Sequence, residues 1–374
     1  MRRILICASF AESLVKFRGA LIQAALDSGV KVHVVAPGLK SDSEITAELE
    51  KKGVVVHDLI MKRTGLNPIV DAVTFVFLFL ILLRVRPTIF LAYTIKPVIY
   101  GSLAAWLVGV HRRFVLITGL GYAFIGESSG KRGVLRKLLQ GLYRFSLART
   151  HKVFFQNPDD EALFRELRLL SDQVPSCIVN GSGVDISEYQ VVPLPEQARF
   201  LLIGRLLGDK GVREYAQAAF AVKAKYPSAC FQMVGWIDDN PDAINQKELD
   251  DWVESGTLEF LGKLDDVRPS IANCRVFVLP SYREGTPRTV LEAMAMGRAI
   301  ITTDAPGCRE TVVDGGNGYL VPVQDSEALA HAMLRCIEYP DNVAAMGVVS
   351  RQIAENKYDV HKVNQIMLKE MGIL

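Results

Sequence analysis

Short apolar runs of the kind that form buried parallel strands recur along the whole chain, with helical patterns between them. This alternation is typical of a doubly wound parallel sheet, in which a helix crosses over a sheet face after each strand. The runs form two series: Ile4–Cys7, Val32–Val35, Val54–His57, Ile89–Ala92, Phe114–Ile117 and Val153–Phe155, and then Phe200–Ile203, Cys230–Val234, Leu258–Leu261, Val276–Leu279, Ala299–Ile301 and Tyr319–Val321. We therefore predict two α/β domains, each built on its own sheet.

The two series are separated by the polar segment Ser187–Gln197, which contains two prolines. A chain of 374 residues is long enough for two domains with separate cores. We predict a first domain over residues 1–190 and a second over residues 191–357.

The stretch from Val276 to Glu292 carries the strongest functional signal. A buried strand leads into a polar loop with Glu284 and then into a helix, for which we expect Thr286 as N-cap and Pro287 as the first helical residue. This places backbone N–H groups and a positive helix end at the carboxyl edge of a sheet, where phosphates bind. One carboxylate then faces the reacting group and the other accepts hydrogen bonds from a ribose. The stretch predicts a nucleotide-sugar site.

The pair Glu284 and Glu292 resembles the signature of the retaining family-4 glycosyltransferases. The resemblance continues in chain order through Gly181–Asp185, Gly204–Tyr215 and Thr302–Pro322, and the N-terminal half fits more loosely. It implies the GT-B fold, with two doubly wound, Rossmann-like domains facing across a cleft.

Two further motifs, SYREGTPR and YTIKP, look most like those of bacterial transferases that extend a sugar on undecaprenyl diphosphate. The resemblance implies transfer of a hexose or N-acetylhexosamine, with GalNAc the best match, from a UDP-sugar to a sugar-diphospho-undecaprenol in O-antigen or capsule biosynthesis. It also implies that no metal or other cofactor is needed and that a C-terminal helix within residues 358–374 packs back onto the first domain. Three alternatives stay open: a UDP-sugar epimerase of the same fold, a non-catalytic membrane-associated scaffold, and a transferase with a soluble acceptor.

Three residues are the predicted catalytic set. Arg205 and Lys210 follow the first strand of the second domain, a position where two cations can meet a diphosphate. By resemblance they neutralise the leaving nucleoside diphosphate, and Glu284 contacts the donor sugar. The implied retaining chemistry is a front-face attack in which a phosphate oxygen takes the acceptor proton, so no protein nucleophile is required.

The remaining donor contacts are also implied by resemblance. Glu292 binds the ribose, although pairing with Arg288 four residues earlier is an alternative role for this carboxylate. Base-binding loops and the backbone after Glu284 supply the rest of the predicted donor set: Gly235, Lys263, Leu264, Gly285, Thr286, Pro287 and Arg288.

The acceptor side is placed on the first domain. Many family members carry a histidine near Thr118–Gly121, and this chain has none there. The Gly119-x-Gly121 pair lacks the third glycine of a dinucleotide fingerprint, because position 124 is Phe. The predicted acceptor contacts are Ser9, Lys16, Arg18, Lys96, Thr118 and Gly119, and for each cation a solvated surface role is the alternative.

The charge is distributed unevenly. Residues 51–152 hold 16 Lys+Arg against 3 Asp+Glu, a balance of +13, whereas the whole chain has a net charge of only +2.

Ala72–Leu83 is an apolar run shorter than the ~20 residues of a membrane span, and it is either a core helix or a helix whose outer face touches lipid. Lys131–Lys152 predicts a basic amphipathic helix, either at a membrane surface or with an ordinary charged outer face. We expect a peripheral protein at the cytoplasmic face of a bacterial inner membrane, bound through residues 51–152.

Other site classes find little support in the sequence. The six cysteines are scattered without a C-x-x-C pair, which fits a reducing compartment and gives no metal site. Asp238–Asp242 contains a D-x-D-like pattern, and we favour a solvated loop there over a metal site. The basic segments lack interleaved aromatics, so a nucleic-acid partner is not expected.

Overall fold

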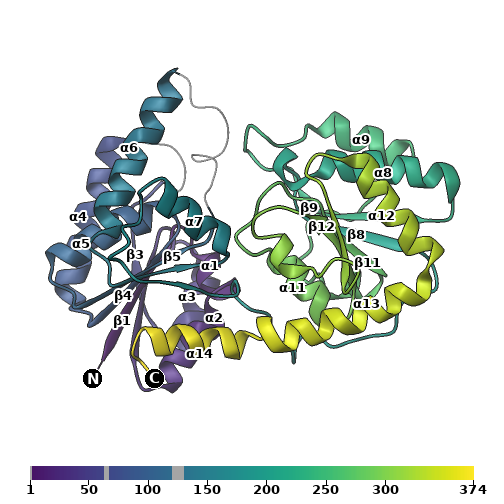
Figure 1. Cartoon of the computed structure of the whole chain (residues 1–374). Helices are drawn as coiled ribbons and strands as arrows, with labels where there is room; N and C mark the ends of the chain where they lie inside the picture. The colour runs from purple at the N-terminus through teal and green to yellow at the C-terminus, as the bar shows by residue number, and fades with distance from the viewer. Residues whose placement is uncertain (1, 63–66, 120–129) are drawn as a thin grey trace. The chain divides into compact units, whose positions relative to one another are not determined.

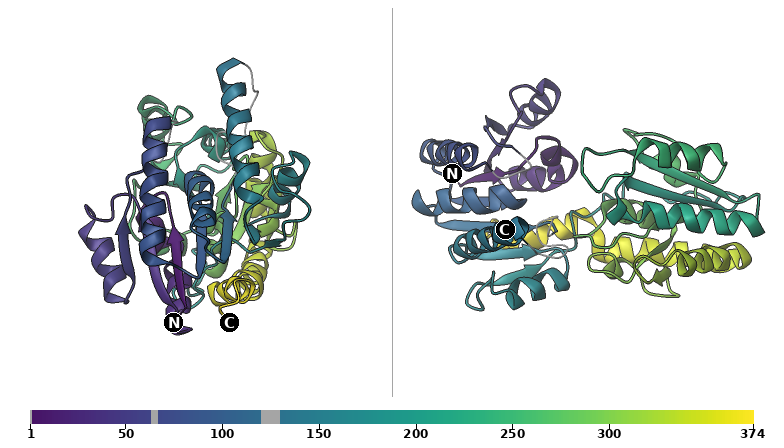
Figure 2. Two further views of the ribbon diagram at one scale, coloured as in Figure 1. Left: turned by 90° about the vertical axis from the view of Figure 1, so that its left-hand side faces the viewer. Right: turned by 90° about the horizontal axis from the view of Figure 1, so that it is seen from above.

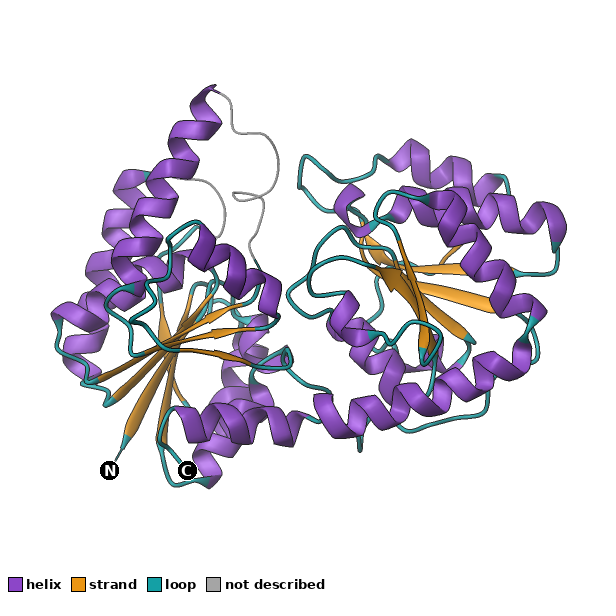
Figure 3. Cartoon of the chain, in the orientation of Figure 1, coloured by secondary structure: helices purple, strands orange, loops and turns teal. Residues whose placement is uncertain are grey.

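The computed structural model describes residues 2–62, 67–119 and 130–374, and the chain divides into two compact units (Figure 1). The first unit comprises Met1–Ser182 and His361–Leu374, and the second comprises Gly183–Val360. Each unit contains one parallel β-sheet with helices on both faces (Figure 3), which confirms the predicted fold class.

The first unit has a seven-stranded sheet with the order β3-β2-β1-β4-β5-β6-β7. Its strands are β1 (Arg3–Cys7), β2 (Lys31–Ala36), β3 (Val55–Asp58), β4 (Ile89–Tyr93), β5 (Arg112–Ile117), β6 (Lys152–Phe155) and β7 (Ser176–Ile178). Its helices are α1 (Glu12–Lys16), α2 (Gly19–Asp27), α3 (Ser43–Lys51), α4 (Pro68–Val85), α5 (Ser102–Leu107), α6 (Gly130–Leu147), α7 (Pro158–Glu166) and α14 (Val360–Glu370). The six predicted strands are present, and the half-buried edge strand β7 was missed because three residues carry no pattern.

The second unit has a six-stranded sheet with the order β10-β9-β8-β11-β12-β13. Its strands are β8 (Arg199–Arg205), β9 (Cys230–Trp236), β10 (Glu259–Phe260), β11 (Val276–Leu279), β12 (Ala299–Thr303) and β13 (Gly318–Val321). Its helices are α8 (Val212–Lys225), α9 (Gln246–Glu254), α10 (Arg268–Ala272), α11 (Arg288–Ala295), α12 (Ser326–Glu338) and α13 (Pro340–Ile353). All six predicted strands of this series are present.

Alternation along the strands builds two cores in the first unit. Leu5 and Cys7 of β1 face the core covered by α4, α5, α6 and α7, whereas Ile4 and Ile6 face the core that includes α14. In α14, Met367 is fully buried in this second core. The chain's C-terminal helix is therefore part of the first unit.

The unit boundaries follow local contacts. Residues 183–190 belong to the second unit, because Val184 pairs with Asp359 and the Tyr189 ring lies in a core cluster of that unit. The division thus falls after Ser182 and after Val360, whereas the sequence prediction placed it after residues 190 and 357.

Helix α4 is longer than the apolar run that predicted it, since Asn67 caps it and Pro68 begins it. With 18 residues and a mean hydropathy of 2.3, it is the one helix in the described chain that is long and apolar enough to cross a membrane. It nevertheless connects β3 and β4 of one parallel sheet, and α4, α5 and α6 lie side by side on that sheet (Figure 2, left). Leu78 and Leu82 are buried against the sheet, whereas Val76 and Leu80 are about half exposed. The core-helix alternative therefore accounts for only one face of α4.

Candidate functional site

The carboxyl edge of the second sheet gathers most of the residues predicted for the donor. β8 lies between β9 and β11, and all three strands run parallel. Their carboxyl ends therefore meet at one edge, which brings together Arg205 at the end of β8, Trp236 at the end of β9 and the loop after Leu279 of β11. Residues that lie far apart in sequence become neighbours at this edge.

Two glycines permit the close packing of these loops. Gly211 has a φ of 70°, and a β-carbon there would clash with the carbonyl oxygen of Pro280. Gly235 has a φ of 157°, and a β-carbon there would clash with the carbonyl oxygen of Gly204. Larger residues would push the loop after β8 away from β9 and β11.

The two predicted catalytic cations both meet carboxylates. The Arg205 guanidinium donates to Asp238 Oδ2 over 3.1 Å, and the Lys210 ammonium pairs with Glu284 Oε1. Ser281 Oγ also donates to Glu284 Oε1, at 2.8 Å. The Lys210–Glu284 pair is largely buried, whereas the Arg205 side chain is 36% exposed. Two cations thus lie at the sheet edge, each with a carboxylate counter-ion.

Asp238 was missed as a site residue because its loop was interpreted as solvated. Its Oδ1 accepts from the backbone N–H of Asn240, and Asn240 Oδ1 accepts in turn from that of Asp242. Asp242 Oδ2 accepts from the backbone N–H of Asp209, next to Lys210. This chain of carboxylate and amide bonds ties the loop after β9 to the loop after β8.

Helix α11 begins one residue later than the sequence predicted. Pro287 occupies the N-cap position with an extended backbone (φ −74°, ψ 109°), and the first helical residue is Arg288. The expectation of Thr286 as N-cap was wrong, because Pro287 holds that position and makes no side-chain capping bond. The amino end of this helix, with its partial positive charge, follows directly after the loop that carries Glu284.

Glu292 lies in the middle of α11 and is only 6% exposed. Its Oε1 accepts from Arg288 Nε at 2.8 Å and from the Tyr189 hydroxyl at 2.9 Å. The pairing with Arg288 that the sequence left open as an alternative is thus present, and Tyr189 is a partner that sequence reasoning did not identify. Burial and the adjacent Glu292 charge raise the pKa of Tyr189 well above its usual value, so its hydroxyl remains a donor.

The predicted base-binding loops also lie at this edge. The N–H of Gly235 donates to the carbonyl of Gly262 over 2.9 Å, which joins the end of β9 to the loop after β10. Lys263 Nζ lies 5.2 Å from the ring centroid of Trp236, whose side chain is 43% exposed. Leu264 packs against the neighbouring core. An exposed tryptophan directly after Gly235 was not considered in the sequence analysis, although its place at a strand end would have marked it.

The predicted acceptor residues of the first unit have varied environments. Lys96 is buried and pairs with Asp71 of α4 over 2.7 Å. Arg18 is buried with its guanidinium 5.2 Å from the Tyr93 ring centroid, whereas Lys16 is exposed and lies 3.4 Å from Glu12.

The other predicted acceptor positions are buried or half-buried. Ser9 is buried, and Thr118 and Gly119 are half-buried just after β5. The positions Leu120, Gly121 and Phe124 lie outside the described residues.

Helix α6 buries only some of its apolar side chains. Leu139 and Tyr143 are buried, whereas Leu138 and Phe145 are about half exposed. Apolar side chains therefore lie on two faces of this helix. The side chains of Lys131, Arg132 and Leu135 lie outside what the structure describes.

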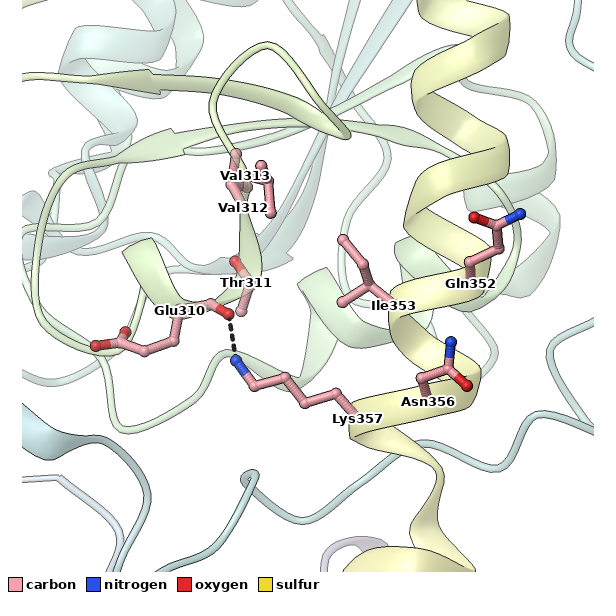
Figure 4. Close-up of a pocket in the computed structure, with 8 residues that line it drawn as sticks. All are labelled: Glu310, Thr311, Val312, Val313, Gln352, Ile353, Asn356 and Lys357. Carbon is pink, nitrogen blue, oxygen red and sulfur yellow. Dashed lines mark hydrogen bonds between the residues drawn. The ribbon is translucent and has the colours of Figure 1, made fainter.

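No group of three or more metal-ligating side chains occurs in residues 2–62, 67–119 and 130–374. A hollow of about 380 Å³ lies elsewhere on the second unit (Figure 4). Its wall contains none of the predicted donor residues, and Lys357 donates across it to the carbonyl of Glu310 over 2.8 Å. It is lined by Glu310, Thr311, Val312, Val313, Gln352, Ile353, Asn356 and Lys357.

Comparison with known families divides the chain in the same way. Residues 197–339 match the family model described as glycosyl transferases group 1, and residues 3–157 match the model described as glycosyl transferase 4-like. The first match falls in the second unit and the second match falls in the first unit.

Curated relatives span nearly the whole chain. An N,N'-diacetylbacillosaminyl-diphospho-undecaprenol alpha-1,3-N-acetylgalactosaminyltransferase of Campylobacter jejuni is 28% identical over 340 residues, 87% of each chain. The capsular polysaccharide biosynthesis glycosyltransferase CapM of Staphylococcus aureus is 22% identical over 99% of this chain and 96% of its own.

Solved structures share the fold over the full length. Anabaena Alr3699/HepE in complex with UDP superposes with a TM-score of 0.78 at 18% identity and covers 100% of both chains. Sucrose-phosphate synthase of Thermosynechococcus elongatus has a TM-score of 0.80 at 17% identity, over 99% of this chain and 98% of its own.

Proposed function

Because the chain belongs to the group 1 glycosyltransferases and has the GT-B fold, we propose that it moves one sugar from a UDP-sugar onto a lipid-linked glycan. The donor sugar is a hexose or N-acetylhexosamine, with N-acetylgalactosamine the first choice, and the acceptor is a sugar on undecaprenyl diphosphate. The similarity to the Campylobacter jejuni transferase supports both choices. The reaction is a step in bacterial surface polysaccharide assembly.

The observation that carries this proposal is the cluster of Arg205, Lys210 and Glu284 beside the start of α11. Two cations and a helix N-terminus at one strand edge suit a diphosphate, whose charge grows as the bond to the sugar breaks. Arg205 and Lys210 then stabilise the departing UDP. This needs the cations to exchange their carboxylate partners for phosphate oxygens.

We assign the donor sugar to Glu284 and the ribose to Glu292. Glu284 is released from Lys210 when that cation meets the diphosphate, and its carboxylate can then accept from a sugar hydroxyl. The base is assigned to the end of β9 at Gly235 and to the loop of Lys263 and Leu264, which the Gly235–Gly262 hydrogen bond holds together. The acceptor hydroxyl attacks on the face that UDP leaves, and a phosphate oxygen takes its proton.

We assign lipid contact to the outer face of α4, α5 and α6. This face carries Ile69, Val76 and Leu80 of α4, each at least half exposed, and Trp106 of α5 and Phe145 of α6. Arg84, Arg86, Lys137 and Arg144 are exposed on or next to the same helices. Exposed apolar side chains among cations suit an anionic bilayer, to which each well-placed cation contributes about 1 kcal/mol. Such a face would hold the enzyme near a lipid-linked acceptor.

Because Lys96 is buried, the role proposed for it on the acceptor side is indirect. Its ammonium is neutralised by Asp71, whose other oxygen accepts from the Tyr100 hydroxyl at 3.1 Å. We therefore propose that Lys96 shapes the acceptor side by fixing the start of α4. Lys16 is the exposed cation of the predicted set and is the proposed contact to the acceptor diphosphate.

The test is product formation by the purified protein with a short prenyl-diphosphate-linked N-acetylhexosamine and a panel of UDP-sugars. One donor should yield a lipid product larger by one sugar. Conversion of a UDP-sugar without acceptor would instead indicate an epimerase. Tight UDP binding with no product from any donor would contradict the proposed acceptor.

A further inference from the structure

The environment of Glu292 is asymmetric. Both of its donors, Tyr189 and Arg288, bind the same oxygen, Oε1, at 2.9 and 2.8 Å. No hydrogen bond to Oε2 is found among the described residues. A buried carboxylate is costly unless its charge is compensated, and here an arginine and a phenol hydroxyl supply that compensation on one side only. One oxygen is held and the other is available to accept.

Tyr189 reaches Glu292 from a segment that is itself tied down. Arg351 of α13 donates from Nη1 to the carbonyl of Tyr189 over 2.8 Å and to that of Ala295, the last residue of α11, over 2.7 Å. The N–H of Tyr189 donates to the carbonyl of Asp185 over 3.2 Å. One arginine thus fixes the backbone of Tyr189 relative to the helix that carries Glu292.

The tyrosine hydroxyl is the part of the residue that the hydrophobic core does not need. The ring lies in the cluster built around Phe277 and Met294, where a phenylalanine would fill the same space. The Arg288 side chain is 29% exposed. Without the Tyr189 hydroxyl, Arg288 alone would therefore hold the Glu292 carboxylate less firmly. The raised pKa of Tyr189 keeps its hydroxyl protonated, so it donates at any physiological pH.

We propose that Tyr189 is a positioning residue for the donor: its hydroxyl holds Glu292 Oε1 so that Oε2 accepts from a ribose hydroxyl. This inference rests on the proposed ribose contact of Glu292. It predicts that Tyr189 contributes to the preference for ribonucleotides over deoxyribonucleotides, although it need not touch the nucleotide itself. A carboxylate that is free to rotate would make the ribose contact less often.

The test measures the dissociation constants of UDP, 2′-deoxy-UDP and 3′-deoxy-UDP by calorimetry for the full-length protein and Tyr189→Phe. The native protein should prefer UDP over at least one deoxy analogue by about tenfold, the scale of one hydrogen bond to a charged group. Tyr189→Phe should reduce this preference by about threefold or more and leave the affinity for that deoxy analogue within about twofold. Tyr215→Phe, which removes another buried hydroxyl of the same unit, should keep the native preference.

Glu292→Ala separates the two levels of the inference. If the native preference is absent, or persists in Glu292→Ala, the ribose contact is wrong and the role of Tyr189 is wrong with it. If Glu292→Ala loses the preference and Tyr189→Phe keeps all of it, the ribose contact stands and the positioning role is refuted. Equal weakening of all three nucleotides in Tyr189→Phe would show mere structural support and would also overturn the proposal.

Discussion

Asp238→Asn is expected to tighten UDP binding. Asp238 Oδ2 lies 3.1 Å from the Arg205 guanidinium, so a diphosphate must compete with this carboxylate for the cation. The asparagine carbonyl can still accept from the N–H of Asn240, a bond of 3.0 Å in the native protein, so the loop should keep its shape. The change removes the negative charge and places an NH₂ group where Arg205 had its acceptor.

The magnitude follows from the exposure of the pair. Arg205 and Asp238 are 36% and 23% exposed, so water screens their attraction and the pair is worth ~0.5–1 kcal/mol. If the diphosphate no longer has to displace this partner, the dissociation constant of UDP should fall by about two- to fivefold. The measurement is calorimetric titration of UDP into the native and variant proteins.

Asp266→Asn is the matched control. Asp266 accepts from the Arg268 backbone N–H at 3.0 Å and pairs with its guanidinium at 2.9 Å, so the same charge is removed from a pair that does not include Arg205. Its UDP affinity should stay native.

A metal role for Asp238 would give the opposite result. Weaker UDP binding by Asp238→Asn, together with activity that is lost in EDTA and restored by Mn²⁺, would show that this carboxylate serves a metal. That outcome would refute the counter-ion reasoning.

Arg205→Ala should reduce turnover by about 10²–10³, the scale for one electrostatic stabiliser, and near-native steady-state turnover would contradict the proposed role. Leu80→Glu should weaken sedimentation with anionic vesicles, whereas Val348→Glu, at a similarly exposed position of the second unit, should not; equal binding by both variants would argue against the lipid-facing surface. Burial, aided by the neighbouring His57, lowers the pKa of His33 to about 4. In the unfolded chain this histidine has an ordinary pKa near 6.5, so between about pH 4 and 6.5 the unfolded chain binds more protons than the native protein. The free energy of unfolding, measured by urea denaturation, should therefore fall from pH 7 to pH 5, by up to about 1.4 kcal/mol per pH unit for this group. The fall should be smaller in His33→Gln.

The sequence by itself determined the architecture of each domain. Twelve apolar runs predicted twelve of the strands, because a buried parallel strand must be apolar on both faces and this demand is local. The donor motif was visible for the same reason: Glu284 and Glu292 lie on one strand–loop–helix unit, so their approximate positions follow from chain order. The short edge strand β7 was missed because its three half-buried residues carry no apolar pattern.

Only the tertiary structure decided which charges meet. Tyr189 and Glu292 are 103 residues apart, and Lys210 and Glu284 are 74 apart. Nothing in either local sequence reveals the partner, because such pairs depend on strand order and on how tightly loops approach across the sheet edge. The burial of Lys96 beside Asp71 was also unpredictable from sequence, because the local motif indicates only the end of a strand. Local patterns record what a segment needs from its immediate surroundings, whereas the partner of a charged side chain is set by the packing of distant segments.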